Sequence, residues 1–433
     1  MEGSMTKAKK KTETPKKDDL PQELDNTQNN SQNDSDYNYC ALPMAAYACR
    51  PDQSKGRLYE EDESSTRTPF QRDRDRIIHA SAFRRLKYKT QVFVYHEGDH
   101  YRTRLSHTLE VSQIARSIAR ALMVNEDLAE AVALAHDLGH TPFAHIGEEF
   151  LQQCMKPFDG FEHNDQSLRI LTKLERKYPG WPGLNMTWET LEGVVKHNGP
   201  VIIPEGKKLP TTLKDVQLQT DLRLDTYASI EAQVAAISDD IAYNNHDVED
   251  GLRAGMFELA DLEKLALMQP IIAKVKKDWP DIDEHYIIQE TIREMIGAMV
   301  TDVLAETKKR LDDLKPKDVE DVRNAGRQTV AFSPDMYTMV EELRAFLHKR
   351  MYRHFTVNRI WIKVERIIPD LFNTFMKHYQ LLPDHWQIRV EEAGGLIDNV
   401  AQARIVCDYI AGMTDRYAIR EHERLFDLYW DLR

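Results

Sequence analysis

The chain has 433 residues, and its 58 basic and 71 acidic side chains give a formal net charge of −13 at pH 7, which argues against a surface that attracts nucleic acid throughout. Hydrophobic residues make up 41% of the chain, enough for a buried core, yet no run approaches the ~20 apolar residues of a membrane-spanning helix. The polar start lacks an apolar leader and the four cysteines have no motif spacing, so we expect a cytoplasmic protein with reduced thiols and no membrane partner.

Residues 1–60 differ in composition from the rest of the chain. A lysine-rich start runs into a stretch of Asn, Gln, Asp and Ser between Asn26 and Asn38, and large aliphatic residues are almost absent. Such a segment cannot bury enough apolar surface to offset the entropy lost on ordering. We therefore predict a disordered polar tail over residues 1–60, followed by one helical domain over residues 61–433.

Helical periodicity begins near Thr66 and continues to the end of the chain. Apolar residues recur at helical spacing over 114–122 and again over 128–135, where the pattern ends near Gly139 and Pro142. Further helical segments are predicted at 162–177, 187–197, 226–252, 257–278, 283–313, 335–380 and 398–431. Three prolines predict a loop or short ribbon over residues 199–224. The pattern as a whole predicts an all-α fold.

Three of these helical segments carry side chains that can bind a metal. His107 lies on the first, His136 and Asp137 end the second, and Asp239 and Asp240 follow about a hundred residues later. Imidazole and carboxylate together form a nitrogen and oxygen ligand set that suits Mn, Fe, Co, Ni, Zn or Mg, with positions left open for water or phosphate. A His-Asp pair alone is more often a core or surface feature. Here the pair follows an apolar helix, where an ionised aspartate needs a partner or a metal.

Longer strings resemble the bacterial deoxyguanosine triphosphate triphosphohydrolase-like family of the HD-domain phosphohydrolase superfamily. They begin at Arg74 (RDRIIHASAFRRL), Lys89 (KTQVF), His96 (HEGDHYRTR), His136 (HDLGHTPFAH), Asp239 (DDIAYNNHD) and Asp408 (DYIAGMTDRY). The resemblance covers the chain from about Thr66 to the C-terminus. It implies an all-α HD-domain helical bundle with its core at about residues 100–250 and additional C-terminal helices.

The resemblance also implies a ligand set for a divalent metal ion. The four positions that match the family's ligands are His107, His136, Asp137 and Asp239. Spacing favours Asp239 over Asp240, because Asp239, Tyr243 and Asp247 are four residues apart and share one helix face. Mn²⁺ or Mg²⁺ is the expected ion, with Fe, Co, Ni or Zn as alternatives.

Substrate contacts follow from the same resemblance. Arg104, one turn before His107, is expected to bind an α-phosphate, because guanidinium can contact phosphate through two N–H groups. The alternative is a surface arginine paired with a nearby carboxylate. The other implied contacts are Gln91 with the deoxyribose 3′-hydroxyl, Tyr243 and Asp247 with sugar and base, Arg344 with phosphate, and Tyr352 stacked on the sugar.

Four residues are candidates for proton transfer. His140 lies on a turn beside the metal ligands, since Pro142 interrupts the helix. His145 and Glu148 are three residues apart at the start of the next helix, close enough for the carboxylate to orient the imidazole. The alternative is an ordinary capping turn with a surface glutamate. His163 matches a family histidine near the triphosphate.

These matches imply a metal-dependent hydrolase that converts a dNTP and water into deoxynucleoside and inorganic triphosphate. Relatives are homo-oligomers and several are activated by a dNTP, so a tetramer or hexamer with a regulatory dNTP is expected from the resemblance alone. One alternative is another HD-type phosphohydrolase that acts on nucleoside monophosphates or cyclic nucleotides. The other is a non-catalytic binder of nucleotides or single-stranded DNA, although no sequence pattern supports DNA as a partner.

Overall fold

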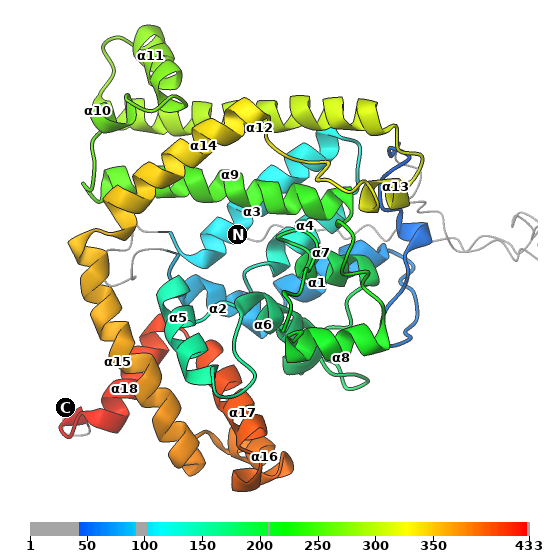
Figure 1. The fold of residues 1–433 in the computed structure, drawn as a ribbon, viewed down its shortest axis with the longest axis vertical. Helices are drawn as coiled ribbons and strands as arrows, with labels where there is room; N and C mark the ends of the chain where they lie inside the picture. The colour runs from blue at the N-terminus through cyan, green and yellow to red at the C-terminus, as the bar shows by residue number, and fades with distance from the viewer. Residues whose placement is uncertain (1–42, 92–101, 207, 431–433) are drawn as a thin grey trace, which may run out of the picture. The chain divides into compact units, whose positions relative to one another are not determined.

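The computed structural model describes residues 43–91, 102–206 and 208–430. Within these ranges the chain forms α-helices joined by loops and short 3-10 or π turns, and no strand (Figure 1). This confirms the predicted all-α fold. The helices are α1 (Pro69–Ile78), α2 (Ser81–Arg85), α3 (Arg104–Ala121), α4 (Glu126–Ala135), α5 (Ala144–Met155), α6 (His163–Arg169), α7 (Trp188–Val195), α8 (Thr211–Gln219), α9 (Ile230–Arg253), α10 (Leu259–Leu262), α11 (Met268–Asp278), α12 (Glu284–Leu314), α13 (Val319–Arg323), α14 (Pro334–Leu347), α15 (Phe355–Lys377), α16 (Asp384–Glu392), α17 (Asn399–Ala411) and α18 (Asp415–Phe426).

Helices α3, α4 and α9 pack against one another and form the centre of the fold (Figure 1). Their shared interior contains fully buried aliphatic side chains, among them Ile118 of α3, Val132 of α4 and Ile241 of α9. Burial of each such side chain contributes about 1.5–3 kcal/mol. The packing fixes the start of α3, the end of α4 and the middle of α9, which carry the predicted ligands.

Local capping determines where α3 begins. The hydroxyl of Thr103 accepts a hydrogen bond from the backbone N–H of Ser106, and the side chain of Ser106 accepts one from the backbone N–H of Thr103. This capping box satisfies the backbone N–H groups of Thr103 and Ser106 at the start of the helix. It places Arg104 in the first turn and His107 one turn later.

A second apolar cluster lies between α5 and the C-terminal helices. Helix α15 packs against α5, α17 and α18. Buried side chains in this cluster include Phe143, Phe150, Ile368 and Phe375. The C-terminal helices therefore support the loop and helix that carry His140, His145 and Glu148.

Four segments differ from the sequence-based expectation, one of them the span predicted at 257–278, which is divided between α10 and α11. The predicted loop at 199–224 contains α8. The prolines of this segment all precede the helix and do not interrupt it, and Leu213 and Val216 are buried on one of its faces. The span predicted at 335–380 is divided by a π-helical turn at His348–Tyr352. The span at 398–431 is likewise divided between α17 and α18, at Gly412 to Thr414.

The tail predicted over residues 1–60 lies mostly outside the described residues. Its last part, from residue 43, packs on the helical domain instead of extending the tail. The backbone N–H of Cys49 donates to Glu231 at 2.8 Å, and Arg57 pairs with Glu61 at 3.0 Å. The boundary predicted at residue 60 is therefore too late, because these buried polar contacts stabilise a segment with few large aliphatics.

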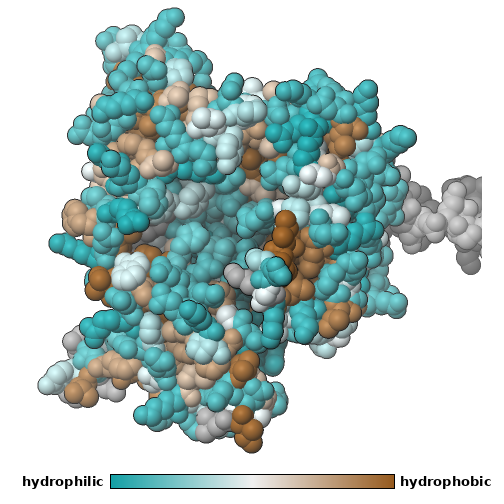
Figure 2. All heavy atoms as spheres, viewed as in Figure 1, coloured by the Kyte–Doolittle hydropathy of each residue, from teal (hydrophilic) through white to brown (hydrophobic). Residues whose placement is uncertain are grey.

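The surface in Figure 2 is mainly hydrophilic with scattered apolar groups, as the high content of charged residues predicts. None of the helices in the described ranges combines the length and the apolar character that a bilayer crossing requires.

Candidate metal centre and catalytic site

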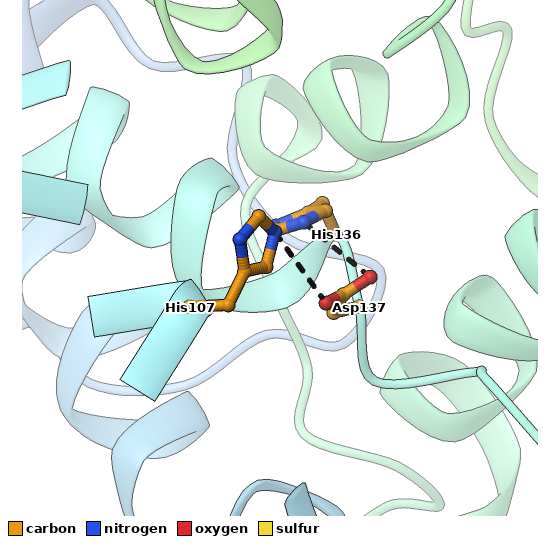
Figure 3. Close-up of side chains that lie close together, drawn as sticks. All are labelled: His107, His136 and Asp137. Atoms are coloured by element: carbon orange, nitrogen blue, oxygen red, sulfur yellow. Dashed lines mark ion pairs between the residues drawn. The ribbon is translucent and has the colours of Figure 1, made fainter. Parts of the chain in front are cut away.

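His107, His136, Asp137 and Asp239 converge where α3, the end of α4 and α9 meet (Figure 3 shows the first three). The Nε2 atom of His107 lies 2.9 Å from Oδ1 of Asp239 and 3.9 Å from Oδ2 of Asp137. The Nε2 atom of His136 lies 3.4 Å from Oδ1 of Asp137 and 3.6 Å from Oδ1 of Asp239. Four potential ligand atoms from three separate segments thus face one another.

Backbone contact orients the ring of His136. Its Nδ1 donates to the carbonyl of Ala133 at 2.6 Å, which directs Nε2 at the cluster, where it can serve as a ligand once its proton is displaced by a cation. That Nε2 atom is buried and has no hydrogen-bond partner among the described residues, and neither has Oδ2 of Asp137. Buried polar atoms in proteins normally have partners. These two are the clearest signs that the cluster accommodates a further group.

A chain of three side chains orients the ring of His107. Burial lowers the pKa of His246 to about 4, so this ring is neutral at physiological pH. Its Nε2–H donates to Glu110, and its Nδ1 then accepts a hydrogen bond from Nδ1–H of His107 at 3.1 Å. The lone pair of His107 Nε2 is consequently left facing Asp137 and Asp239.

The cluster favours positive charge. Burial raises the pKa of Asp137, but Arg104, His136 and His140 outweigh it and hold this pKa well below its usual range. Burial likewise lowers the pKa of His136, but Asp137 and Asp239 outweigh it and raise this pKa to about 9. Two ionised carboxylates with imidazole nitrogens between them form an environment suited to a cation.

Arg104 is buried beside this cluster, with 1% of its surface exposed. Its Nη1 donates to Oδ1 of Asp137 at 2.9 Å, whereas Nε and Nη2 have no hydrogen-bond partner among the described residues. The alternative of a surface arginine is therefore wrong. Two unused, buried N–H groups next to a metal-binding arrangement are suited to an anion.

His140, His145, Glu148 and His163 form an adjoining group. The rings of His140 and His163 stack at 4.1 Å between centroids, and Nε2 of His140 lies 3.1 Å from Oδ1 of Asp137. Glu148 lies closer to His163 than to the predicted partner His145, with 2.8 Å to Nδ1 of His163 and 3.7 Å to Nδ1 of His145. His145 is exposed, whereas His140 is buried.

Electrostatics distinguish the members of this group. Burial and the nearby Arg104 hold the pKa of His140 well below its usual range, so its ring is neutral. Burial raises the pKa of Glu148, but hydrogen bonds from His145 and His163 outweigh it and lower this pKa strongly. Glu148 is therefore an ionised carboxylate that can hold a positive imidazolium.

Gly139 permits the close approach of α6. A Cβ atom at this position would lie 2.1 Å from the carbonyl oxygen of His163 and 2.3 Å from the backbone nitrogen of Ser167. The hydroxyl of Ser167 also accepts from the N–H of Gly139 at 2.9 Å and donates to the carbonyl of His136 at 3.0 Å. The missing side chain is what lets His163 stack on His140.

The residues expected to contact the nucleoside form a second group. The hydroxyl of Tyr352 donates to Asp247, and the hydroxyls of Tyr243 and Tyr352 are hydrogen-bonded to each other. Gln91 is buried, and its Oε1 has no hydrogen-bond partner among the described residues. Arg344 pairs with Asp240 at 2.7 Å and with Glu341 at 2.9 Å. Asp240 thus points away from the ligands, as predicted, and holds the arginine expected to bind phosphate.

Sequence reasoning missed three contributors to the metal centre. Nε2 of His197 lies 3.3 Å from Oδ2 of Asp239, and its ring stacks on His136 at 5.2 Å. His246 and Glu110 orient His107 as described. His246 follows Asp239 by seven residues, two helical turns, so its place on the ligand face could have been recognised. His197 meets Asp239, and Glu110 meets His246, only because the chain folds, so sequence spacing could not predict either contact.

Comparison with known proteins agrees with this arrangement. The family model described as HD domain matches residues 104–244, and the one described as phosphohydrolase-associated domain matches residues 330–424. A deoxyguanosinetriphosphate triphosphohydrolase-like protein of Parvibaculum lavamentivorans is 55% identical over 89% of this chain and 97% of its own length. Proteins with the same description from Caulobacter sp. and Mesorhizobium japonicum are 54% and 52% identical over 89% and 90% of this chain, and over 97% and 96% of their own lengths.

Proposed function

The chain belongs to the deoxyguanosinetriphosphate triphosphohydrolase-like family, and from this premise we propose that it hydrolyses dNTPs to deoxynucleoside and inorganic triphosphate with a divalent metal ion. The observation that carries the proposal is the buried pairing of a cation-binding cluster with an anion-binding arginine. Among the described residues, His136 Nε2 and Asp137 Oδ2 have no hydrogen-bond partner, and neither have Nε and Nη2 of Arg104 next to them. A metal ion would bind the ligand atoms of His136 and Asp137, and its phosphate ligand would accept from Arg104.

The chemistry of the donors fits such an ion. Ligands about 2.1 Å from a metal lie roughly 3.0–3.5 Å apart at octahedral or tetrahedral angles. The closest atoms of His107, His136, Asp137 and Asp239 are 2.9 to 3.9 Å apart, which is near this range. An ion held by these four residues, Mn²⁺ or Mg²⁺ in our proposal, supplies Lewis-acid polarisation of the α-phosphate.

Arg104 binds and stabilises the α-phosphate in this proposal. Its guanidinium is already oriented by Asp137, and its unused N–H groups can donate to two phosphate oxygens. Charge that develops on these oxygens during hydrolysis is stabilised by a donor that needs no reorientation.

Two histidines are proposed to move the protons. If Nε2–H of neutral His140 donates to Asp137, its Nδ1 carries the lone pair, and this buried atom has no hydrogen-bond partner in the part of the chain that the structure describes. Nδ1 of His140 is thus suited to accept a proton from the attacking water. His145 is exposed, and its Nδ1 lies 3.7 Å from the carboxylate of Glu148, so we propose it as the donor of a proton to the leaving 5′-oxygen.

The nucleoside is proposed to bind at Gln91, Tyr243, Asp247 and Tyr352. Oε1 of Gln91, which has no partner among the residues that the structure describes, can accept from the 3′-hydroxyl, and the Tyr352–Asp247 pair supplies polar groups for sugar and base. His163, which Glu148 holds at 2.8 Å, is proposed to contact the phosphate chain. We extend the proposal to a cytoplasmic homo-oligomer, a tetramer or hexamer regulated by a dNTP; this part rests on family likeness alone.

Product analysis tests the proposal directly. The purified protein is mixed with each dNTP singly, and with all four together, in Mn²⁺ or Mg²⁺, and products are separated by anion exchange. We expect deoxynucleoside and intact triphosphate, abolished by His136→Ala but not by substitution of the exposed His285 with alanine. Nucleoside monophosphate with pyrophosphate, or no product under any condition, would contradict the proposed reaction.

A further inference from the structure

Two buried ionisable side chains, Lys89 and Asp415, join the C-terminal helices to the loops that border the candidate site. They are 3% and 0% exposed. Asp415 is the first residue of α18, and Lys89 lies two positions before Gln91. Neither belongs to the metal cluster or to the residues proposed to touch substrate.

Both oxygens of Asp415 are used by site loops. Oδ2 accepts from the backbone N–H of Thr90 at 3.0 Å and from its hydroxyl, whereas Oδ1 accepts from the backbone N–H of Phe143 at 2.9 Å. These partners lie 325 and 272 residues away in the sequence. One carboxylate therefore fastens the segment that leads to Gln91 and the turn between His140 and His145.

Lys89 makes a parallel connection. Its ammonium group donates to the carbonyl of His140, and to the carbonyl of Ala411 at 2.8 Å. Its own carbonyl accepts from the backbone N–H of Arg104 at 3.0 Å. Lys89 thus ties together the last residue of α17, the turn after the metal ligands, and the first turn of α3.

The turn fastened by Asp415 has a strained backbone. Phe143 and Ala144 have φ angles of 64° and 56°, in the left-handed region that is unfavourable for residues with a side chain. Such a conformation persists only where its surroundings hold it. The N–H of Phe143 is held by Asp415, and its ring is buried in the cluster with the C-terminal helices. Helix α5, with His145 and Glu148, begins directly after this turn.

We propose that Asp415 and Lys89 are positioning residues, through which the C-terminal helices hold the Gln91 segment and the His140–His145 turn in place around the metal centre. This inference rests on the proposed function, since its consequence is for dNTP hydrolysis. It gives a specific task to the region matched by the phosphohydrolase-associated domain. That region contributes no proposed metal ligand.

The test compares Asp415→Asn with Asp408→Asn. Asp408 is also a buried carboxylate of the C-terminal helices, but it accepts from Arg169 and Arg404. The first readout is hydrogen exchange of the amides in residues 139–147. We expect at least tenfold faster exchange in Asp415→Asn, because the amide replaces one of the two acceptor oxygens with a donor, so the backbone N–H groups of Thr90 and Phe143 cannot both keep an acceptor. We expect no acceleration in Asp408→Asn.

The second readout is steady-state hydrolysis together with metal content. We expect kcat to fall at least tenfold in Asp415→Asn with unchanged metal content, while Asp408→Asn retains kcat. If Asp415→Asn does not fold, Lys89→Met provides the same comparison. The positioning role would be overturned if Asp415→Asn exchanged the amides of the turn at the wild-type rate. It would also be overturned if the variant exchanged them faster but kept the wild-type kcat. A wild-type protein that hydrolyses no dNTP, yet shows the exchange difference, contradicts the proposed function and leaves the structural connection supported.

Discussion

Substitution of Asp247 with asparagine tests the electrostatics of the nucleoside end of the site. Asp247 is buried on α9 and 1% exposed, and its Oδ1 has no hydrogen-bond partner among the described residues. Burial raises the pKa of this carboxyl to about 8, despite the hydrogen bond from Tyr352. The unfolded chain has an aspartate pKa of about 3.9. The folded protein therefore holds a proton here that the unfolded chain releases above pH 4.

The sign of the effect follows from proton linkage. Between pH 4 and pH 8 the native state binds more protons at this site, so the free energy of unfolding falls as pH rises. Each pH unit corresponds to about 1.4 kcal/mol for a fully displaced proton. From pH 5 to pH 8 this side chain should reduce stability by roughly 2–4 kcal/mol. Asparagine does not titrate and can still accept from Tyr352.

Urea unfolding of wild type and Asp247→Asn at several pH values between 5 and 8 measures this effect. The stability of the variant relative to wild type should increase by those 2–4 kcal/mol over the interval. Asp281→Asn, at an exposed position, serves as the control and should follow wild type. A difference between Asp247→Asn and wild type that does not change with pH would refute a neutral Asp247 in the folded protein.

Three other substitutions test separate parts of the site. Glu110→Gln should weaken binding of Mn²⁺ by about 10–100-fold, measured by calorimetry, because the chain that orients His107 is broken; unchanged affinity would refute this chain. Glu148→Gln should keep the metal and lower kcat at least tenfold, and an unchanged kcat would remove Glu148 from proton transfer. Gly139→Ala should lower the free energy of unfolding by about 2 kcal/mol or more, because the new Cβ would collide with the backbone of His163. Gly180→Ala is the control, since a Cβ there meets open space and should not destabilise the fold. Equal stabilities of the two variants would contradict the close approach of α6 to Gly139.

Residues related by helical spacing could be predicted from the sequence, whereas residues related only by tertiary packing could not. Asp239, Tyr243 and Asp247 share a face of α9 because the period of a helix is known in advance. The preference of Glu148 for His163 over His145 depends on how α6 approaches α5, which Gly139 permits.

The same distinction explains errors in the elements. Prolines in residues 199–224 indicated a loop, but α8 begins directly after Pro210 and is held by burial of its apolar face. The π-helical turn that places Tyr352 near Asp247 has no spacing signal of its own. Lys89 and Asp415 meet their partners across hundreds of residues, so their role could only be inferred from the folded chain.

Under the proposed function, helix α9 sets a distance along the bound substrate. It carries Asp239, a proposed metal ligand, and Asp247, a proposed nucleoside contact, on one rigid segment. Eight residues of helix rise about 12 Å, so the helix backbone sets the separation between these two positions. An inserted residue between them would turn one end by about 100° relative to the other. If the proposal holds, side chains near Asp247 can change base preference without displacing the proposed ligands, so that selectivity and catalysis can vary independently.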